Sequence, residues 1–149
     1  MNTLTPWQDR FRTPDVQSLR STVDPESLTA FDRIRTHLLS IESIDEGPGW
    51  HGSSYCWCLE YRLPGREEPL AILIPSPIDL QLAMPIDEVF LGQLPLRRMK
   101  RGIRDGLDLA SPPFHTSWAI WSLSPANLLE ELEDVINRRV RFLGETVGA

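Results

Sequence analysis

The fold is decided by the stretch from Ser54 to Met84, which reads SYCWCLEYRLPGREEPLAILIPSPIDLQLAM. It consists of apolar and aromatic runs separated by two turn-forming segments, Pro64-Gly65 and Pro75-Ser76-Pro77. Short runs of this composition, bounded by proline and glycine, are typical of β-strands. The stretch therefore predicts an antiparallel meander with strands over residues 54–62, 70–74 and 78–84.

Each run also indicates which of its faces is buried. Side chains alternate across a strand, so one face of the first strand is expected to carry Tyr55, Trp57, Leu59 and Tyr61. Leu70–Ile74 is apolar at every position, which predicts a central strand covered on both faces. In the third run, the larger apolar side chains again fall on a single face.

Helical patterns are found on either side of the meander. Before it, apolar residues recur every three to four positions, which predicts a helix over residues 25–42 with Asp24 as its N-cap. A shorter helix over 14–21 is compatible with the preceding Thr13-Pro14. After the meander, the same periodicity predicts a final helix that begins at Pro125 and ends at Gly144.

Between the meander and the final helix, the pattern is ambiguous. Residues 95–109 fit either a helix or a strand, and we favour the helix because a strand would place Asp105 on its apolar face. Residues 116–122 predict a fourth strand. The resulting order is α-β-β-β-α-β-α, an α+β fold with a four-stranded, mostly antiparallel sheet covered by helices. Residues 1–24 form an N-terminal arm, and 25–144 form a single domain.

Composition argues against several classes of protein. The chain has 149 residues, of which 41% are hydrophobic and 24% charged, as in ordinary globular domains. Its net charge of −6 argues against a dedicated nucleic-acid binder. The segment Met1–Arg12 does not resemble a secretory signal, and no stretch approaches the roughly 18 apolar residues of a membrane span. We therefore expect a cytoplasmic protein with no membrane partner.

Cys56 and Cys58 are the only cysteines. Structural zinc sites usually separate paired cysteines by two to four residues, so that the chain can wrap around the ion. A single intervening residue within a strand does not allow this, and it also disfavours a disulfide. The chain contains no nucleophile elbow and no phosphate-binding loop. We expect no metal and no cofactor, and we assign no catalytic residue.

A basic cluster lies within the ambiguous segment. Its members are Arg97, Arg98, Lys100, Arg101 and Arg104. Such a cluster can neutralise phosphates, but Asp105 and Asp108 follow one helical turn later and offset part of its charge. A solvated helix face, or contact with an acidic partner, is therefore the favoured interpretation.

The candidate ligand site consists of Trp50, His51, His115 and Trp121. Each histidine is expected near the start of a strand, and tryptophans accompany both. Glycines around Trp50 allow close approach of the backbone to a ligand, while imidazole and indole groups provide hydrogen bonds and flat apolar walls. The site requires the first and fourth predicted strands to be neighbours with these ends together.

The run Tyr55-Cys56-Trp57-Cys58-Leu59-Glu60-Tyr61-Arg62, taken with Trp118-Ala119-Ile120-Trp121 and the final helix, resembles the YdhG-like group of small uncharacterised bacterial domains. The similarity covers about residues 25–143. It implies an intracellular α+β domain with a role in stress or small-molecule handling, and it supplies no catalytic residues. The cysteine pair and the basic cluster have no counterpart in that pattern.

These observations favour a non-catalytic domain that binds a small molecule or a protein partner. One alternative is an enzyme whose site combines His51 and His115 with Cys56 and Cys58. Another is contact with an acidic partner or a nucleic acid through the basic cluster, Arg97–Arg104. A homodimer is compatible with all three.

Overall fold

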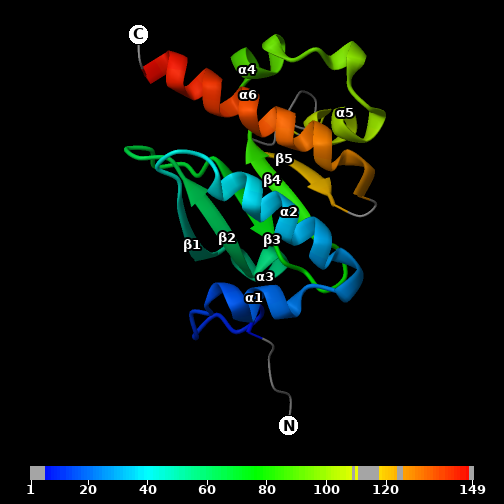
Figure 1. Cartoon of the computed structure of the whole chain (residues 1–149). Helices are drawn as coiled ribbons and strands as arrows, with labels where there is room; N and C mark the ends of the chain where they lie inside the picture. The colour runs from blue at the N-terminus through cyan, green and yellow to red at the C-terminus, as the bar shows by residue number, and fades with distance from the viewer. Residues whose placement is uncertain (1–5, 109, 111–117, 124–125, 148–149) are drawn as a thin grey trace.

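The computed structural model describes residues 6–108, 110, 118–123 and 126–147. They form six α-helices and one open five-stranded antiparallel sheet (Figure 1). The strands are β1 (Asp45–Trp50), β2 (Trp57–Arg62), β3 (Ala71–Ile74), β4 (Gln81–Pro85) and β5 (Trp118–Ser122). The helices are α1 (Val16–Thr22), α2 (Leu28–Leu39), α3 (Gly52–Tyr55), α4 (Glu88–Gln93), α5 (Arg101–Asp108) and α6 (Leu129–Val147). Short 3-10 turns are η1 (Pro25–Ser27), η2 (Leu96–Arg98) and η3 (Ala126–Leu128).

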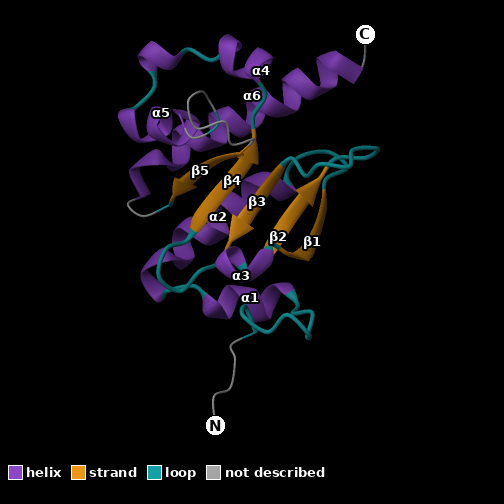
Figure 2. Ribbon diagram, turned by 180° about the vertical axis from the view of Figure 1, so that it is seen from behind, coloured by secondary structure: helices purple, strands orange, loops and turns teal. Residues whose placement is uncertain are grey.

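The sheet confirms the predicted α+β class and the antiparallel meander. Its strand order is β1-β2-β3-β4-β5, so each strand pairs with its neighbour in the chain. Helices α2 and α6 cross one face of the sheet (Figure 1). In the opposite view the strands lie in front of α2, and the short α3 lies at the lower end of the sheet (Figure 2).

The predicted count of four strands is wrong, because residues 45–50 form the edge strand β1. Gly47, Pro48 and Gly49 have low strand propensity, and the sequence pattern therefore predicts a loop there. Tertiary contacts override that preference. Trp50 pairs with Trp57 at one end of the β1–β2 ladder, and Asp45 pairs with Arg62 at the other.

Glu46 anchors β1 to the rest of the molecule. Its carboxylate accepts a hydrogen bond from the Tyr61 hydroxyl at 2.7 Å and two from the Arg35 guanidinium, at 2.9 and 3.0 Å. Arg35 lies on α2 and Tyr61 on β2, so one carboxylate joins a helix to two strands. Hydrogen bonds to a charged group contribute more to stability than neutral ones, which favours the strand despite its glycines.

The predicted faces of the meander are confirmed for the residues that form its strands. Tyr55 is the exception, because it belongs to α3 and lies on the opposite face from Trp57. Leu59, Leu73 and Leu82 lie in the main core beneath the helices, and β3 is buried on both faces. The first strand begins later than predicted, at Trp57, because residues 52–55 form α3 and Cys56 has a positive φ of 58°. The third begins at Gln81, and Ile78 is exposed to solvent.

The first two helices differ from the prediction at their starts. Helix α1 begins at Val16, because the Asp15 side chain accepts a hydrogen bond from the Ser18 amide at 2.7 Å and caps the helix there. The helix expected over 25–42 is divided into η1 and α2, and the Asp24 side chain makes no capping hydrogen bond. The buried stripe of α2 is as predicted and consists of Phe31, Ile34 and Leu38.

The last helix does not end at Gly144 but continues to Val147. A glycine that terminates a helix adopts a positive φ, and Gly144 does not. Ser124 and Pro125, the predicted start, lie outside the described residues. Helix α4 is an additional element, capped by Asp87, whose side chain accepts a hydrogen bond from the Phe90 amide at 2.7 Å.

The ambiguous segment is helical, as we favoured, although η2 precedes α5. Helix α5 packs against β5 through Trp121, whose indole N–H donates to the Ile103 carbonyl oxygen at 2.9 Å. A Cβ at Gly106 would collide with that indole. The absence of a side chain at Gly106 therefore permits the close approach of α5 to β5. No helix in the described part of the chain has the length and apolar character needed to cross a membrane.

We predict that Leu132→Ala and Ile136→Ala each lower the free energy of unfolding by about 2–4 kcal/mol, because both side chains are fully buried on α6. Chemical denaturation measures the change. The exposed Arg141 on the same helix provides the control, and Arg141→Ala should shift stability by less than about 0.5 kcal/mol. Losses as small as the control's for both core variants would contradict the assigned core.

Candidate functional site

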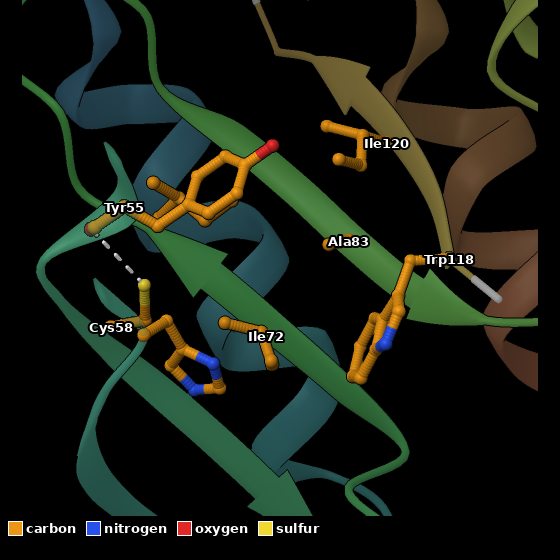
Figure 3. Close-up of a pocket in the computed structure, with 8 residues that line it drawn as sticks. Tyr55, Cys58, Ile72, Ala83, Trp118 and Ile120 are labelled. Atoms are coloured by element: carbon orange, nitrogen blue, oxygen red, sulfur yellow. Dashed lines mark hydrogen bonds between the residues drawn. The ribbon is translucent and has the colours of Figure 1, made fainter. Parts of the chain in front are cut away.

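A cavity of about 420 Å³ lies on the sheet face opposite α2 and α6. Its lining residues come from β2, β3, β4, β5 and the α3 segment: His51, Tyr55, Cys58, Ile72, Ile74, Ala83, Trp118 and Ile120. Tyr55 and Trp118 stand at opposite ends, with Ile72 and Ala83 on the floor between them (Figure 3). Most of this lining is apolar.

The floor of the cavity is a second apolar cluster, separate from the main core. Cys58, Ile72, Ile74 and Ala83 are buried there, with Trp118 and Ile120 packed against them. The alternation of β2, β3 and β4 produces this cluster, because every second side chain points away from the helices. The continuous apolar run of β3 thus supplies both the main core and the cavity floor.

A row of charged and polar groups forms one edge of the same sheet face. His51 Nε2 lies 2.7 Å from Glu60 Oε2, and the Arg62 guanidinium donates to Glu60 Oε1 at 2.8 Å. Gly49 makes room for the carboxylate, since a Cβ there would collide with Glu60. The Glu60 carboxylate therefore holds the imidazole at the border of the cavity.

The α3 segment places Tyr55 beside this row. Its side chain is 38% exposed, and its carbonyl oxygen accepts hydrogen bonds from the indole N–H of Trp7 and from the Cys58 thiol, at 3.1 and 3.5 Å. The chain then enters β2 through Cys56, whose φ of 58° is rare for a residue with a side chain. Backbone strain of this kind costs on the order of 1–3 kcal/mol and is often found at functional sites.

The cysteines do not provide a reactive thiol. Burial raises the pKa of Cys58 far above its ordinary value and raises the pKa of Cys56 as well. The raised pKa values favour the protonated thiols, whereas the thiolate is the form that acts as nucleophile and metal ligand. Within the described residues, no three carboxylate, imidazole or thiol groups are gathered so as to hold a metal ion.

The structure brings together only part of the predicted ligand site. His51 lines the cavity. Trp50 instead packs edge-on against Trp57, with ring centroids 5.7 Å apart, and belongs to the opposite face. Trp121 is buried in the main core. His115 lies outside the described residues.

The strand arrangement that the predicted ligand site requires is not present. The strand of residues 57–62 and the strand of 118–122 are not neighbours, because β3 and β4 lie between them. Antiparallel pairing places His51 at the end where β2 begins, and Trp118 beside Pro85, where β4 ends. The two groups therefore approach the cavity from opposite ends of the sheet.

Of the residues that line the cavity, His51 alone belongs to the predicted ligand site, and the tryptophan present is Trp118 rather than Trp121. Trp118 and Trp121 are three residues apart, so they must face opposite sides of β5. Ile120 shares the parity of Trp118, and Ala83, which pairs with Ile120, is on the same face. The parity was visible in the sequence, but the burial of each face depended on where the helices packed.

The basic cluster lies elsewhere, on η2 and α5. Lys100 is tied to the start of the last helical segment, since its ammonium group donates to the Asn127 carbonyl oxygen at 2.6 Å and its amide donates to Glu131 at 3.0 Å. Arg101 and Arg104 line a shallow hollow together with Asp105 and Asp108. The hollow therefore carries both basic and acidic side chains.

No family model, curated protein or solved structure matches this chain. The resemblance of its aromatic strands to the YdhG-like group therefore stays a prediction.

We predict that Cys58 in the folded protein reacts with a thiol reagent about 100-fold or more slowly than in the unfolded chain, because the buried thiol must wait for local opening. The variant Cys56→Ser isolates Cys58, and labelling is followed at about pH 8 with and without denaturant. Cys58→Ser reports Cys56 separately. If Cys58 reacted as fast in the folded protein as in denaturant, the thiol would be accessible to solvent and the prediction would be wrong.

Proposed function

We propose that this chain is a non-catalytic binding domain, and that the cavity on the open sheet face takes a small, planar, mostly apolar molecule. The main support for the proposal is an apolar cavity with one polar edge, which lies on the sheet face opposite α2 and α6. Small-molecule sites are concave, mainly apolar and equipped with a few placed polar groups.

Size and shape support a ligand of one or two rings. Ligand cavities typically enclose roughly 300–1,000 Å³, and this one has about 420 Å³. The Trp118 and Tyr55 rings stand at its two ends, where flat apolar walls favour a planar molecule (Figure 3). A hydrogen-bonding substituent on the ligand would meet His51 or the Tyr55 hydroxyl.

Binding accounts for the cavity better than catalysis does. The alternative enzyme combines His51 with the cysteines, yet the Cys58 thiol is buried and its pKa is raised. The Glu60 carboxylate contacts His51 in the way that a carboxylate orients the general base of many enzymes. The same contact also compensates the partly buried carboxylate, which needs a partner whether or not any reaction occurs.

A protein partner is the second candidate for this face. Flat or convex apolar surfaces suit protein contacts, whereas the Trp118 and Tyr55 side chains here enclose a hollow. An acidic partner could bind the basic cluster only through charge. Asp105 and Asp108 lie in the same hollow as Arg101 and Arg104 and reduce the net positive charge there.

The dye 1-anilinonaphthalene-8-sulfonate is a suitable probe because its apolar rings match the size of the cavity, while its anionic sulfonate group can stay at the polar edge. We predict saturable binding to the folded protein, seen as increased dye fluorescence and a raised midpoint of thermal unfolding. Ala83→Phe should weaken binding about ten-fold or more, since the added ring projects into the cavity from its floor.

Val89→Phe is the matched control, because Val89 is an exposed apolar residue of α4 outside the cavity. It adds a ring at the surface and should leave binding unchanged. Circular dichroism confirms that both variants are folded. Dye binding that is absent, or that survives unchanged in Ala83→Phe, would contradict the proposal. Once binding is established, a panel of phenols and naphthols competing with the dye would identify the ligand class.

A further inference from the structure

A second cavity, of about 520 Å³, lies at the other end of the sheet from His51, between the β2–β3 turn and α6. It differs from the first cavity because charged side chains line it. Arg66, Glu67 and Glu68 come from the turn, Pro85 from the end of β4, and Arg139 and Leu143 from α6.

Arg139 is buried to an unusual degree for a charged residue. Only 5% of its surface is exposed, and its guanidinium lies over the rings of Phe90 and Phe142, 5.1 and 5.5 Å from their centroids. These contacts hold the planar group in one orientation. A desolvated cation is costly unless its charge and its N–H donors are matched by partners.

The partners within the described residues match Arg139 only in part. One terminal nitrogen, Nη1, donates to Asp87 Oδ2 at 3.0 Å. The Asp87 side chain also caps α4 through its other oxygen, and it is about half exposed. The Nε of Arg139 is buried and has no hydrogen-bond partner among the described residues.

Arg66 brings a second guanidinium to the same cavity. Its Nη2 donates to the Leu143 carbonyl oxygen at 3.0 Å, which ties the β2–β3 turn to α6. This bond uses one of the five N–H donors that a guanidinium carries. Two arginines from separate elements, each held in place by another contact, thus border one hollow.

From this geometry we propose that the cavity between the β2–β3 turn and α6 binds a small oxyanion, a carboxylate or phosphate group, on Arg66 and Arg139. The planar fork of arginine matches the paired oxygens of these groups. The bound anion would compensate the buried positive charge of Arg139, which Asp87 contacts through a single nitrogen, Nη1. Glu67 and Glu68 are exposed residues of the same turn, and their negative charge limits the affinity. This site is independent of the apolar cavity on the sheet face.

The test titrates the folded full-length chain with inorganic phosphate and, separately, with acetate, while sodium chloride keeps the ionic strength constant. Nitrogen–proton correlation spectra follow the Arg139 Nε–H signal directly. We expect saturable shifts of that signal with at least one of the two anions, and none with chloride alone. The anion that saturates at the lower concentration identifies the preferred oxyanion.

Arg66→Gln should weaken the response about five-fold or more, because it removes one of two cationic partners but keeps a polar side chain on the turn. Arg141→Gln on α6 is the matched control, since Arg141 is exposed and does not line this cavity, and it should bind as the unmodified chain does. No saturable shift with either anion, an equal response to chloride, or unchanged affinity in Arg66→Gln would overturn the proposal. If a variant fails to fold, the shift of the Arg139 Nε–H signal in the unmodified chain still shows whether the cavity binds an oxyanion.

Discussion

The central strand β3 is apolar on both faces, and the rest of the structure accommodates that constraint. Helices α2 and α6 cover one face and complete the main core. The other face needs cover as well, and the described residues that shelter it are the side chains of neighbouring strands together with the α3 segment. A strand of this kind is usual where helices lie on both faces of a sheet. In this chain the unequal cover leaves a hollow, and the cavity follows from it.

Charged residues near the sheet are organised by carboxylates that serve two partners each. Glu46 accepts from Tyr61 and Arg35, and thereby joins β1, β2 and α2. Glu60 bridges the side chains of His51 and Arg62 along the cavity edge. Asp87 caps α4 and pairs with Arg139. Because each carboxylate links separate segments, these contacts fix how loops and helices are placed around the strands. Among the buried side chains that the structure describes, Arg139 has a nitrogen, Nε, without a hydrogen-bond partner.

Local patterns in the sequence predict the elements whose apolar residues recur with a clear period. They fail where contacts with residues far along the chain determine the secondary structure. The meander and the buried stripe of α2 follow from alternation and from helical spacing. Strand β1 was missed because Gly47, Pro48 and Gly49 disfavour a strand locally, whereas Glu46 and the pairing with β2 favour it through residues far along the chain. The site was only partly predictable for the same reason. The choice between Trp118 and Trp121 depended on which face the helices cover. Helical spacing places Arg139 on the buried stripe of α6, three residues after Ile136 and four before Leu143. Its charge is what argues against burial in the sequence, since arginine is rarely buried unless it is paired.

The two edges of the sheet are protected from further strand addition in different ways. Helix α5 packs along β5 at one edge. At the other edge, β1 carries Pro48 in its centre, and proline has no N–H to donate to an incoming strand. An unpaired edge normally invites another chain to extend the sheet, which is the first step of fibril growth. The Gly-Pro-Gly segment that makes β1 hard to recognise in the sequence thus also makes this edge a poor template for an added strand.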